Sequence, residues 1–170
     1  MIKQEWLKLD ENKRYQKIYH KEISLASIKK YWPIFDDLEK SLVLHLYKLP
    51  FKFIKKYWPN FNYNLEILSY QYQQLPSKFI ENYWHRITEY GQYQIFQHQK
   101  LRPKFIEKIW SGLSPNFKTL VLTYQDINFE FLKKVWSTLT ESQKNIIKIN
   151  PLKRIWYYKL KEEERNEKNL

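Results

Sequence analysis

The chain has 170 residues, of which 43% are hydrophobic and none is cysteine, so it can bury a core but cannot form disulfides, cysteine-based zinc sites or a thiol nucleophile. It contains no apolar run long enough to span a bilayer, and its first 14 residues are too polar for a signal peptide. We therefore expect a cytoplasmic or other intracellular protein, which could be that of a host cell, without a membrane partner. The net charge of +12 rests on 25 lysines and only five arginines.

Tryptophan recurs at a constant interval of 26 residues along the chain. Each of the six tryptophans in this series has isoleucine or leucine four residues before it and an apolar residue three after it. A fixed period of about 20 to 50 residues is typical of repeat arrays, and 26 residues accommodate two short helices and two turns. The sequence therefore predicts an all-α solenoid of about six helix-turn-helix repeats, elongated in shape. The repeated residues are Trp6, Trp32, Trp58, Trp84, Trp110 and Trp136.

The first repeat differs from the following ones because its second half is polar and basic. We expect residues 1–26 to form an N-terminal cap repeat whose outer face meets water, followed by core repeats over 27–150.

The copy over 51–76 shows the pattern of a core repeat. Its first helix places apolar residues on one arc, with Lys55 and Lys56 on the opposite side. Those apolar residues are Phe53, Ile54, Tyr57 and Trp58. Pro59 disfavours a helical Trp58, so it is expected to end or kink this helix. A second helix is predicted from about Tyr63 to Gln74.

The C-terminal segment also departs from the repeat, because Lys153 stands where leucine or isoleucine is expected. Pro151 opens a segment with four apolar residues on one helical face: Leu152, Ile155, Trp156 and Leu160. We predict that residues 151–170 form a C-terminal capping helix and a charged tail. The whole chain, 1–170, would then be a single repeat domain.

Three copies share the pattern Gln-x-Leu/Ile-x-x-x-Phe-Ile/Leu. They are Gln73-x-Leu75 with Phe79-Ile80, Gln99-x-Leu101 with Phe105-Ile106, and Gln125-x-Ile127 with Phe131-Leu132. This pattern resembles the short two-helix tandem repeats, with a Gln-x-Leu-Ser-x-x-Phe-Ile signature, of uncharacterised bacteriophage and large DNA virus proteins. The resemblance implies an α-helical array and a viral source, and it implies no chemistry. A phage-type source would suit a modulator or inhibitor of a host or defence complex.

Catalytic patterns are missing from the sequence: there is no Gly-rich phosphate loop, no nucleophile elbow and no close histidine pair. His85 with Glu81 and Glu89 permits a base with an orienting carboxylate, but ion pairing on a helix surface is the simpler interpretation. We predict a protein that is not an enzyme and that needs no cofactor and no metal.

The aromatic residues allow two interpretations. The tryptophans could serve as base-stacking platforms, but they share one helical arc with the repeated isoleucine, which favours core positions. Exposed aromatic side chains are expected instead off that arc, at Tyr63, Tyr70 and Tyr90.

Lysines follow the repeated isoleucine by one or two positions, and equivalent positions of a solenoid stack into a stripe. This predicted stripe contains Lys3, Lys29, Lys30, Lys55, Lys56, Lys108, Lys133 and Lys134, and it is interrupted by Glu81, Asn82 and Glu107. A second basic cluster contains Lys144, Lys148, Lys153 and Arg154. The stripe suits a phosphate backbone, but a solvated outer face is the simpler interpretation. The overall positive charge is explained equally well by a polyanion partner and by an AT-rich genome that raises the lysine content.

Two functions remain open from the sequence. The first is a monomeric, non-catalytic interaction protein that holds a protein or ribonucleoprotein partner on an α-repeat surface. The second is direct binding of RNA or DNA through the lysine stripe.

Overall fold

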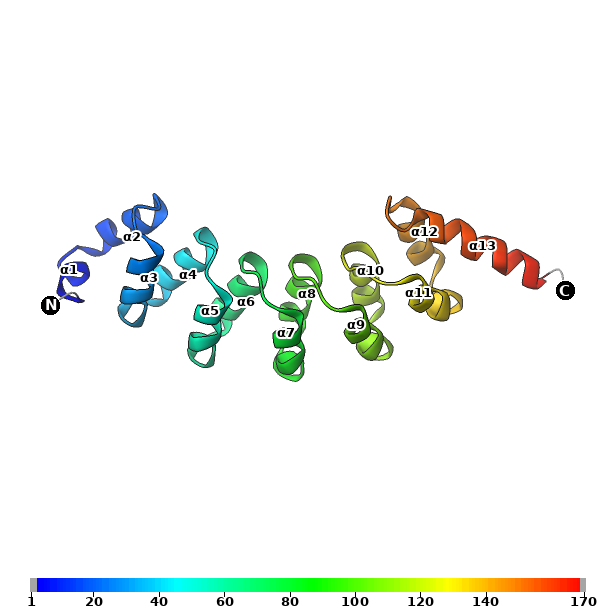
Figure 1. The fold of residues 1–170 in the computed structure, drawn as a ribbon, viewed down its shortest axis with the longest axis horizontal. Helices are drawn as coiled ribbons and strands as arrows, with labels where there is room; N and C mark the ends of the chain where they lie inside the picture. The colour runs from blue at the N-terminus through cyan, green and yellow to red at the C-terminus, as the bar shows by residue number, and fades with distance from the viewer. Residues whose placement is uncertain (1–2, 169–170) are drawn as a thin grey trace.

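The computed structural model describes the backbone of residues 3–168 and the side chains of residues 5–166, so Ile2 and the side chain of Lys3 lie outside the described part. Within residues 3–168 the chain forms thirteen α-helices, five short 3₁₀ turns and no strand, which confirms the predicted all-α solenoid. The helices follow one another along an elongated, gently bowed array, with α1 and α13 at opposite ends (Figure 1).

Each core repeat consists of a seven-residue first helix, a 3₁₀ turn and a longer second helix. The first helices are α3 (Leu25–Tyr31), α5 (Phe51–Tyr57), α7 (Ser77–Tyr83), α9 (Pro103–Ile109) and α11 (Phe129–Val135). The second helices are α4 (Asp37–Leu46), α6 (Tyr63–Tyr72), α8 (Glu89–His98), α10 (Pro115–Tyr124) and α12 (Glu141–Ile149). The 3₁₀ turns are η1 (Trp32–Ile34), η2 (Trp58–Asn60), η3 (Trp84–Arg86), η4 (Trp110–Gly112) and η5 (Trp136–Thr138). The array begins with α1 (Lys3–Leu7) and α2 (Glu11–Tyr19) and ends with α13 (Arg154–Lys168).

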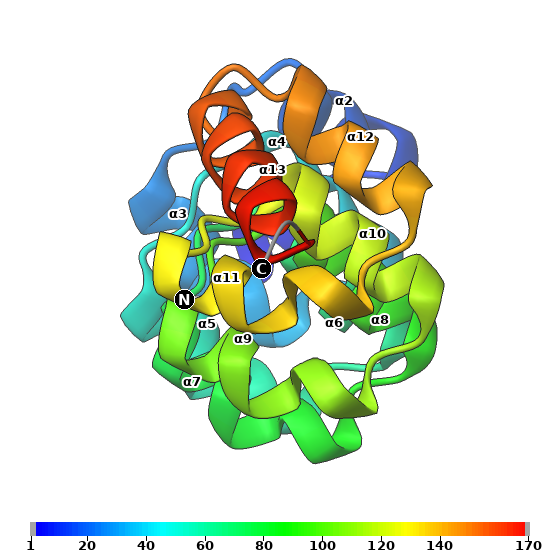
Figure 2. The ribbon, with the colours of Figure 1, turned by 90° about the vertical axis from the view of Figure 1, so that its right-hand side faces the viewer.

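The two kinds of helix form two layers. The second helices pack against each other in chain order, from α2 through α4, α6, α8 and α10 to α12. Viewed along the array, α7, α9 and α11 lie on one side and α6, α8 and α10 on the other (Figure 2). The repeated isoleucines and tryptophans fill the space between the layers as one continuous hydrophobic core.

A short polar side chain caps the N-terminus of each second helix. In every case its oxygen accepts a hydrogen bond from the backbone N–H three residues later, which satisfies a donor that the helix itself leaves unpaired. The caps are Asp10, Asp36, Asn62, Thr88, Ser114 and Thr140. They share the 26-residue period, and they fix the point at which each second helix begins.

The first helix ends at the tryptophan in every core repeat, but proline is not the reason. Trp58, which precedes Pro59, stays in the right-handed helical region with φ −49° and ψ −42°. Trp84 and Trp110 adopt almost the same angles and begin the same 3₁₀ turn without a following proline. The turn is closed by a backbone N–H three residues later, as in the 3.1 Å bond from Leu113 to the Trp110 carbonyl. The turn thereby directs the apolar residue at its end, here Leu113, back into the core.

The tryptophan rings link consecutive repeats. Five of the six rings make an edge-to-face contact with an aromatic ring 21 residues later, at centroid distances of 5.2, 5.0, 5.3, 5.2 and 5.8 Å. The pairs are Trp32–Phe53, Trp58–Phe79, Trp84–Phe105, Trp110–Phe131 and Trp136–Tyr157. We call the six tryptophans that recur every 26 residues the tryptophan ladder. Five of them are buried and Trp84 is half-buried, so the ladder belongs to the core and its rings are not platforms for bases.

Three buried glutamines, Gln73, Gln99 and Gln125, provide a second connection between repeats. We call them the glutamine column. The Gln99 Oε1 accepts a hydrogen bond from the Leu75 N–H at 3.0 Å, while its Nε2 donates to the carbonyls of Tyr70 and Gln73. Gln73 and Gln125 repeat these three bonds with the equivalent groups of their own neighbours. Each glutamine therefore satisfies carbonyls at the C-terminal end of the preceding second helix.

Other residues take over the glutamine's role at the two ends of the array. The Tyr47 hydroxyl donates to the Ile18 carbonyl at 3.2 Å. Ile18 corresponds to Leu44 of the next repeat, whose carbonyl accepts a hydrogen bond from Gln73. At the other end, the Lys153 ammonium donates to the carbonyls of Leu122 and Gln125, both at 2.7 Å.

The C-terminal helix differs from its prediction. It begins at Arg154 rather than Pro151, because 151–153 form a turn. Leu152 and Ile155 are 79% and 75% exposed, so they do not belong to the buried face that the sequence suggested, whereas Leu160 does. Helix α13 packs against α12.

The N-terminal repeat is closed by a polar network around Glu39. The Trp6 indole donates to its carboxylate at 3.1 Å, and Arg14 lies 3.2 Å from the same oxygen. Burial raises the pKa of Glu39, and the Arg14 guanidinium opposes this shift.

Replacing Gln99 with methionine should destabilise the protein by about 3 kcal/mol, because three buried backbone groups lose their hydrogen-bond partner. Methionine is similar in size to glutamine, so the change leaves the packing largely intact. Urea unfolding followed by circular dichroism measures the change. Gln97→Met is the control, since Gln97 bonds only to the exposed Tyr93 hydroxyl. Equal urea midpoints for the two variants would show that the hydrogen bonds of Gln99 contribute nothing to the stability of the protein.

Trp110→Ala should cost about 3 to 5 kcal/mol through the cavity it leaves, and Trp84→Ala should cost less, because Trp84 is only half-buried. Thermal unfolding of the two variants side by side tests this order. A larger loss for Trp84→Ala would contradict the burial of the ladder.

Candidate binding surfaces

The histidine and glutamates that suggested a catalytic base do not form a unit. Glu81 receives hydrogen bonds from the Arg102 guanidinium, at 2.8 Å from Nε, and from the Ser77 hydroxyl at 2.7 Å. These bonds hold the pKa of the Glu81 carboxyl below its usual range. His85 lies in η3 and Glu89 begins α8, so the helical spacing assumed from the sequence is broken between them.

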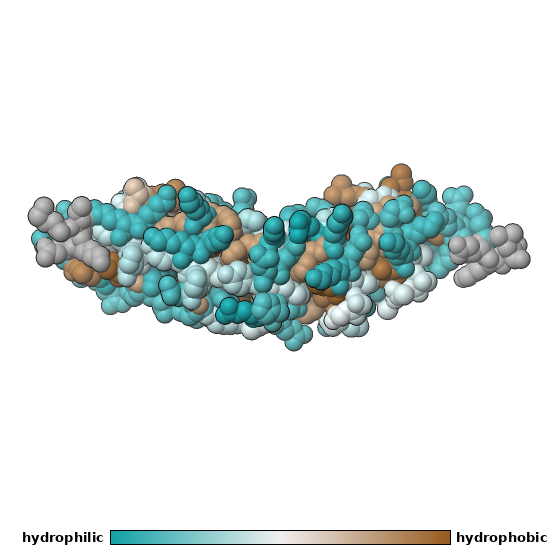
Figure 3. Space-filling view, turned by 60° about the horizontal axis from the view of Figure 1, so that its bottom comes forward, coloured by the Kyte–Doolittle hydropathy of each residue, from teal (hydrophilic) through white to brown (hydrophobic). Residues whose placement is uncertain are grey.

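The predicted lysine stripe lies on the outer side of the first helices. All seven of its described lysines are exposed: Lys29, Lys30, Lys55, Lys56, Lys108, Lys133 and Lys134. They emerge from the side opposite the buried isoleucines, as the helical wheel predicted. Figure 3 shows the molecule with the lower edge of Figure 1 brought forward, and hydrophilic residues predominate on this face.

The stripe is not uniform along the array. Glu81 of α7 is paired with Arg102, and Glu107 of α9 accepts a hydrogen bond from the Asn128 side chain at 3.0 Å. Lys133 of α11 forms an ion pair with Glu163 of α13 at 2.8 Å. The charge at the C-terminal half of the stripe is therefore partly balanced, while α3 and α5 contain no acidic residue.

The prediction that the second basic cluster forms a basic surface was wrong. Lys144 is only 6% exposed and lies between Glu141 and Glu164, at 3.3 and 3.4 Å, with its ammonium over the Trp136 ring. Lys153 is only 4% exposed and serves the last rung of the glutamine column. Lys148 and Arg154 are exposed, but two buried members leave no continuous basic patch.

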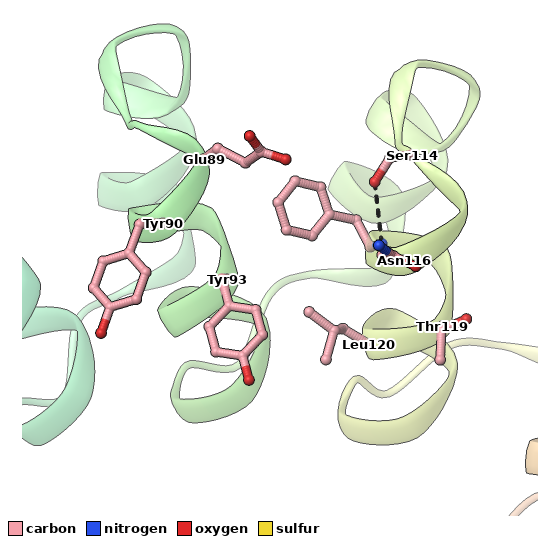
Figure 4. Close-up of a pocket in the computed structure, with 8 residues that line it drawn as sticks. Glu89, Tyr90, Tyr93, Ser114, Asn116, Thr119 and Leu120 are labelled. Atoms are coloured by element: carbon pink, nitrogen blue, oxygen red, sulfur yellow. Dashed lines mark hydrogen bonds between the residues drawn. The ribbon is translucent and has the colours of Figure 1, made fainter.

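A depression lined by tyrosines lies on the other layer, between α8 and α10. Its volume is about 590 Å³, and Tyr90 and Tyr93, which are 50% and 39% exposed, stand on its α8 side. Figure 4 shows Leu120 of α10 projecting toward Tyr93, with Glu89 above them. The complete lining is Glu89, Tyr90, Tyr93, Ser114, Asn116, Phe117, Thr119 and Leu120.

A second hollow adjoins the depression at Tyr90. This hollow has a volume of about 370 Å³, and Tyr90 lines it together with residues of α4 and α6. The other residues of this hollow are Ser41, Tyr63, Asn64, Ile67 and Leu68. We call the two hollows together the tyrosine face. Tyr63 and Tyr90 are exposed as expected, but Tyr70 is buried against Trp58, so its predicted exposure was wrong.

Lys153 should give the stability a distinct pH dependence, because burial lowers its pKa to about 8. Between this value and the ordinary lysine pKa of about 10.4, the unfolded chain holds a proton that the folded chain has released. Stability therefore rises with pH in this window. The unfolding free energy of the wild type relative to Lys153→Met should increase from pH 7.5 to pH 10, as measured in urea. A constant or falling difference would show that the amine is well solvated.

Comparison with known proteins identifies no relative. No family model, no curated protein and no solved structure matches the chain. In the described part of the chain, no cluster of three or more histidine, aspartate or glutamate side chains is placed to hold a metal ion. None of the helices between residues 3 and 168 has the length and apolar composition needed to cross a bilayer. Inference about function therefore starts from the lysine stripe and the tyrosine face.

Proposed function

We propose that the protein is a non-catalytic scaffold that binds a protein partner on the tyrosine face, acting as a monomer in the cytoplasm. The depression between α8 and α10 carries this proposal. Tyrosine side chains supply large contact areas at a small cost in conformational entropy, and they are enriched among the residues that dominate binding energy. Tyr90 and Tyr93 stack at 6.3 Å, so they offer such an area already ordered.

The chemistry of the tyrosine face favours a protein over a nucleic acid. Neither hollow is lined by lysine or arginine. The one charged residue in the lining of the two hollows is Glu89, which is negative. A phosphate backbone would meet repulsion there. A peptide or protein surface would find phenol and alcohol hydroxyls, the amides of Asn64 and Asn116, and apolar contacts from Phe117 and Leu120.

The tyrosine face is built on second helices that the core holds in place. Phe117 and Ile67 are buried at the floor of the hollows, while the tyrosines stand above them. A surface fixed in this way loses little freedom on binding, which favours affinity. The ionisable groups of the lining are one carboxylate and phenols, a set suited to hydrogen bonding.

The double variant Tyr90→Ser, Tyr93→Ser should lose its protein partner. Tagged protein expressed in its native host is captured, treated with nuclease and compared by quantitative mass spectrometry. The wild type should retain a protein that the variant has lost at least tenfold, because both anchoring rings are removed.

The matched control is Tyr19→Ser, Tyr124→Ser, which removes two tyrosines that are 61% and 45% exposed and lie outside the tyrosine face. This control should capture the partner as the wild type does. Equal capture by both double variants would refute the proposal, and so would the release of every captured protein by nuclease.

A further inference from the structure

The outer sides of α3 and α5 carry a concentrated positive charge. The two helices have the related sequences LASIKKY and FKFIKKY, and they contain five lysines. All five are exposed: Lys29, Lys30, Lys52, Lys55 and Lys56. Within the described residues, no ion pair involves any of them. Here we call these five residues the N-terminal lysine patch.

The acidic residues of the helix between α3 and α5 in the chain are engaged elsewhere. Asp36 caps α4, and Glu39 is buried beside Trp6 and Arg14. Asp37 lies 3.7 Å from Lys40 and accepts a hydrogen bond from the Asn62 side chain. The N-terminal lysine patch therefore keeps its charge for a partner outside the chain.

Two of the lysines are held in related positions in consecutive repeats. The Lys30 ammonium lies 5.2 Å from the centre of the Tyr31 ring, and the Lys56 ammonium lies 5.0 Å from that of Tyr57. Helices α3 and α5 are the first helices of consecutive repeats and lie next to each other in the row of first helices (Figure 1), so one flexible strand that follows the row can contact both. The patch thus presents a lysine in the same position beside a tyrosine ring in two consecutive repeats.

We propose that the N-terminal lysine patch binds the phosphate backbone of single-stranded nucleic acid. Lysines neutralise phosphates without reading sequence, and α3 and α5 have no arginine to form bidentate contacts with bases in a duplex groove. Both helices are seven residues long and belong to a continuous row, so neither projects as an element that could enter a groove (Figure 1). A single strand can follow such a row.

This site is narrower than the stripe that the sequence predicted. On α7 the stripe position is occupied by Glu81, and on α11 Lys133 is paired with Glu163. The buried Lys144 and Lys153 remove the C-terminal cluster from the path. Binding should therefore concentrate on α3 and α5. It does not depend on the tyrosine face, which lies on the other layer.

The test is a salt titration with a fluorescein-labelled oligouridylate of about 20 nucleotides, measured by fluorescence anisotropy. Each phosphate contact with a single strand contributes about −0.7 to the slope of log affinity against log salt. The quadruple variant Lys29→Gln, Lys30→Gln, Lys55→Gln, Lys56→Gln should therefore flatten the slope by about 2 to 3. All four side chains are exposed, so circular dichroism should show unchanged helicity.

The matched control changes four lysines on α9 and α11: Lys104→Gln, Lys108→Gln, Lys133→Gln and Lys134→Gln. It removes the same formal charge from two later first helices and should change the slope by less than about 1. Lys108, Lys133 and Lys134 are equivalent to lysines of the test variant, and Lys104 is equivalent to Lys52. The double variant Tyr90→Ser, Tyr93→Ser should bind the oligouridylate as the wild type does, which separates this proposal from the protein-binding function.

Four outcomes would overturn the proposal. The wild type could fail to bind oligouridylate at low salt, or the control could lose as much of the slope as the test variant. A duplex of equal length could bind more tightly than the single strand. Polyglutamate could compete as well as polyuridylate, which would identify an acidic protein surface as the partner instead.

Discussion

The array depends on buried hydrogen bonds between the end of one repeat and the end of the next. A helix leaves its last carbonyls unpaired, and each carbonyl that is buried without a partner costs about 1 to 3 kcal/mol. Gln99 satisfies this requirement for α6, and Gln125 does so for α8. Because α4, α6 and α8 are each completed by a glutamine of the following repeat, these repeats are not finished units on their own.

This requirement also explains how the array can end. A glutamine at the last rung would belong to another full repeat, whereas Lys153 reaches the same two kinds of carbonyl from a turn that leads directly into α13. The long side chain brings an ammonium into a buried position, and the depression of its pKa reflects that cost. Tyr47 solves the corresponding problem at the N-terminal end with a neutral hydroxyl.

Much of the fold could be predicted from the sequence because the period and the apolar arc depend on residues close together in the chain. Ile54 and Trp58 lie on one arc whatever their neighbours are, and so do the outward positions of Lys55 and Lys56. Lys153 was misjudged, because its burial depends on carbonyls 28 and 31 residues away. Lys144 and Tyr70 were also misjudged, because helical spacing does not reveal which side chains from outside the helix cover a position: Glu164 lies beside Lys144, and Trp58 packs against Tyr70. The six N-caps, in contrast, were visible as a column of short polar residues and were overlooked.

The two layers place different demands on the residues that face outward. The lysine pair of α3 recurs at the equivalent positions of α5, so this part of the surface repeats from one repeat to the next and suits a polymer with a repeating charge. The tyrosine face varies instead: the positions of Tyr90 and Tyr93 are held by Asn64 and Ile67 in the preceding repeat and by Asn116 and Thr119 in the following one. A surface that differs at every repeat can recognise only one register of a partner. The core fixes the inner positions alone, so the two outer surfaces can specify different partners independently.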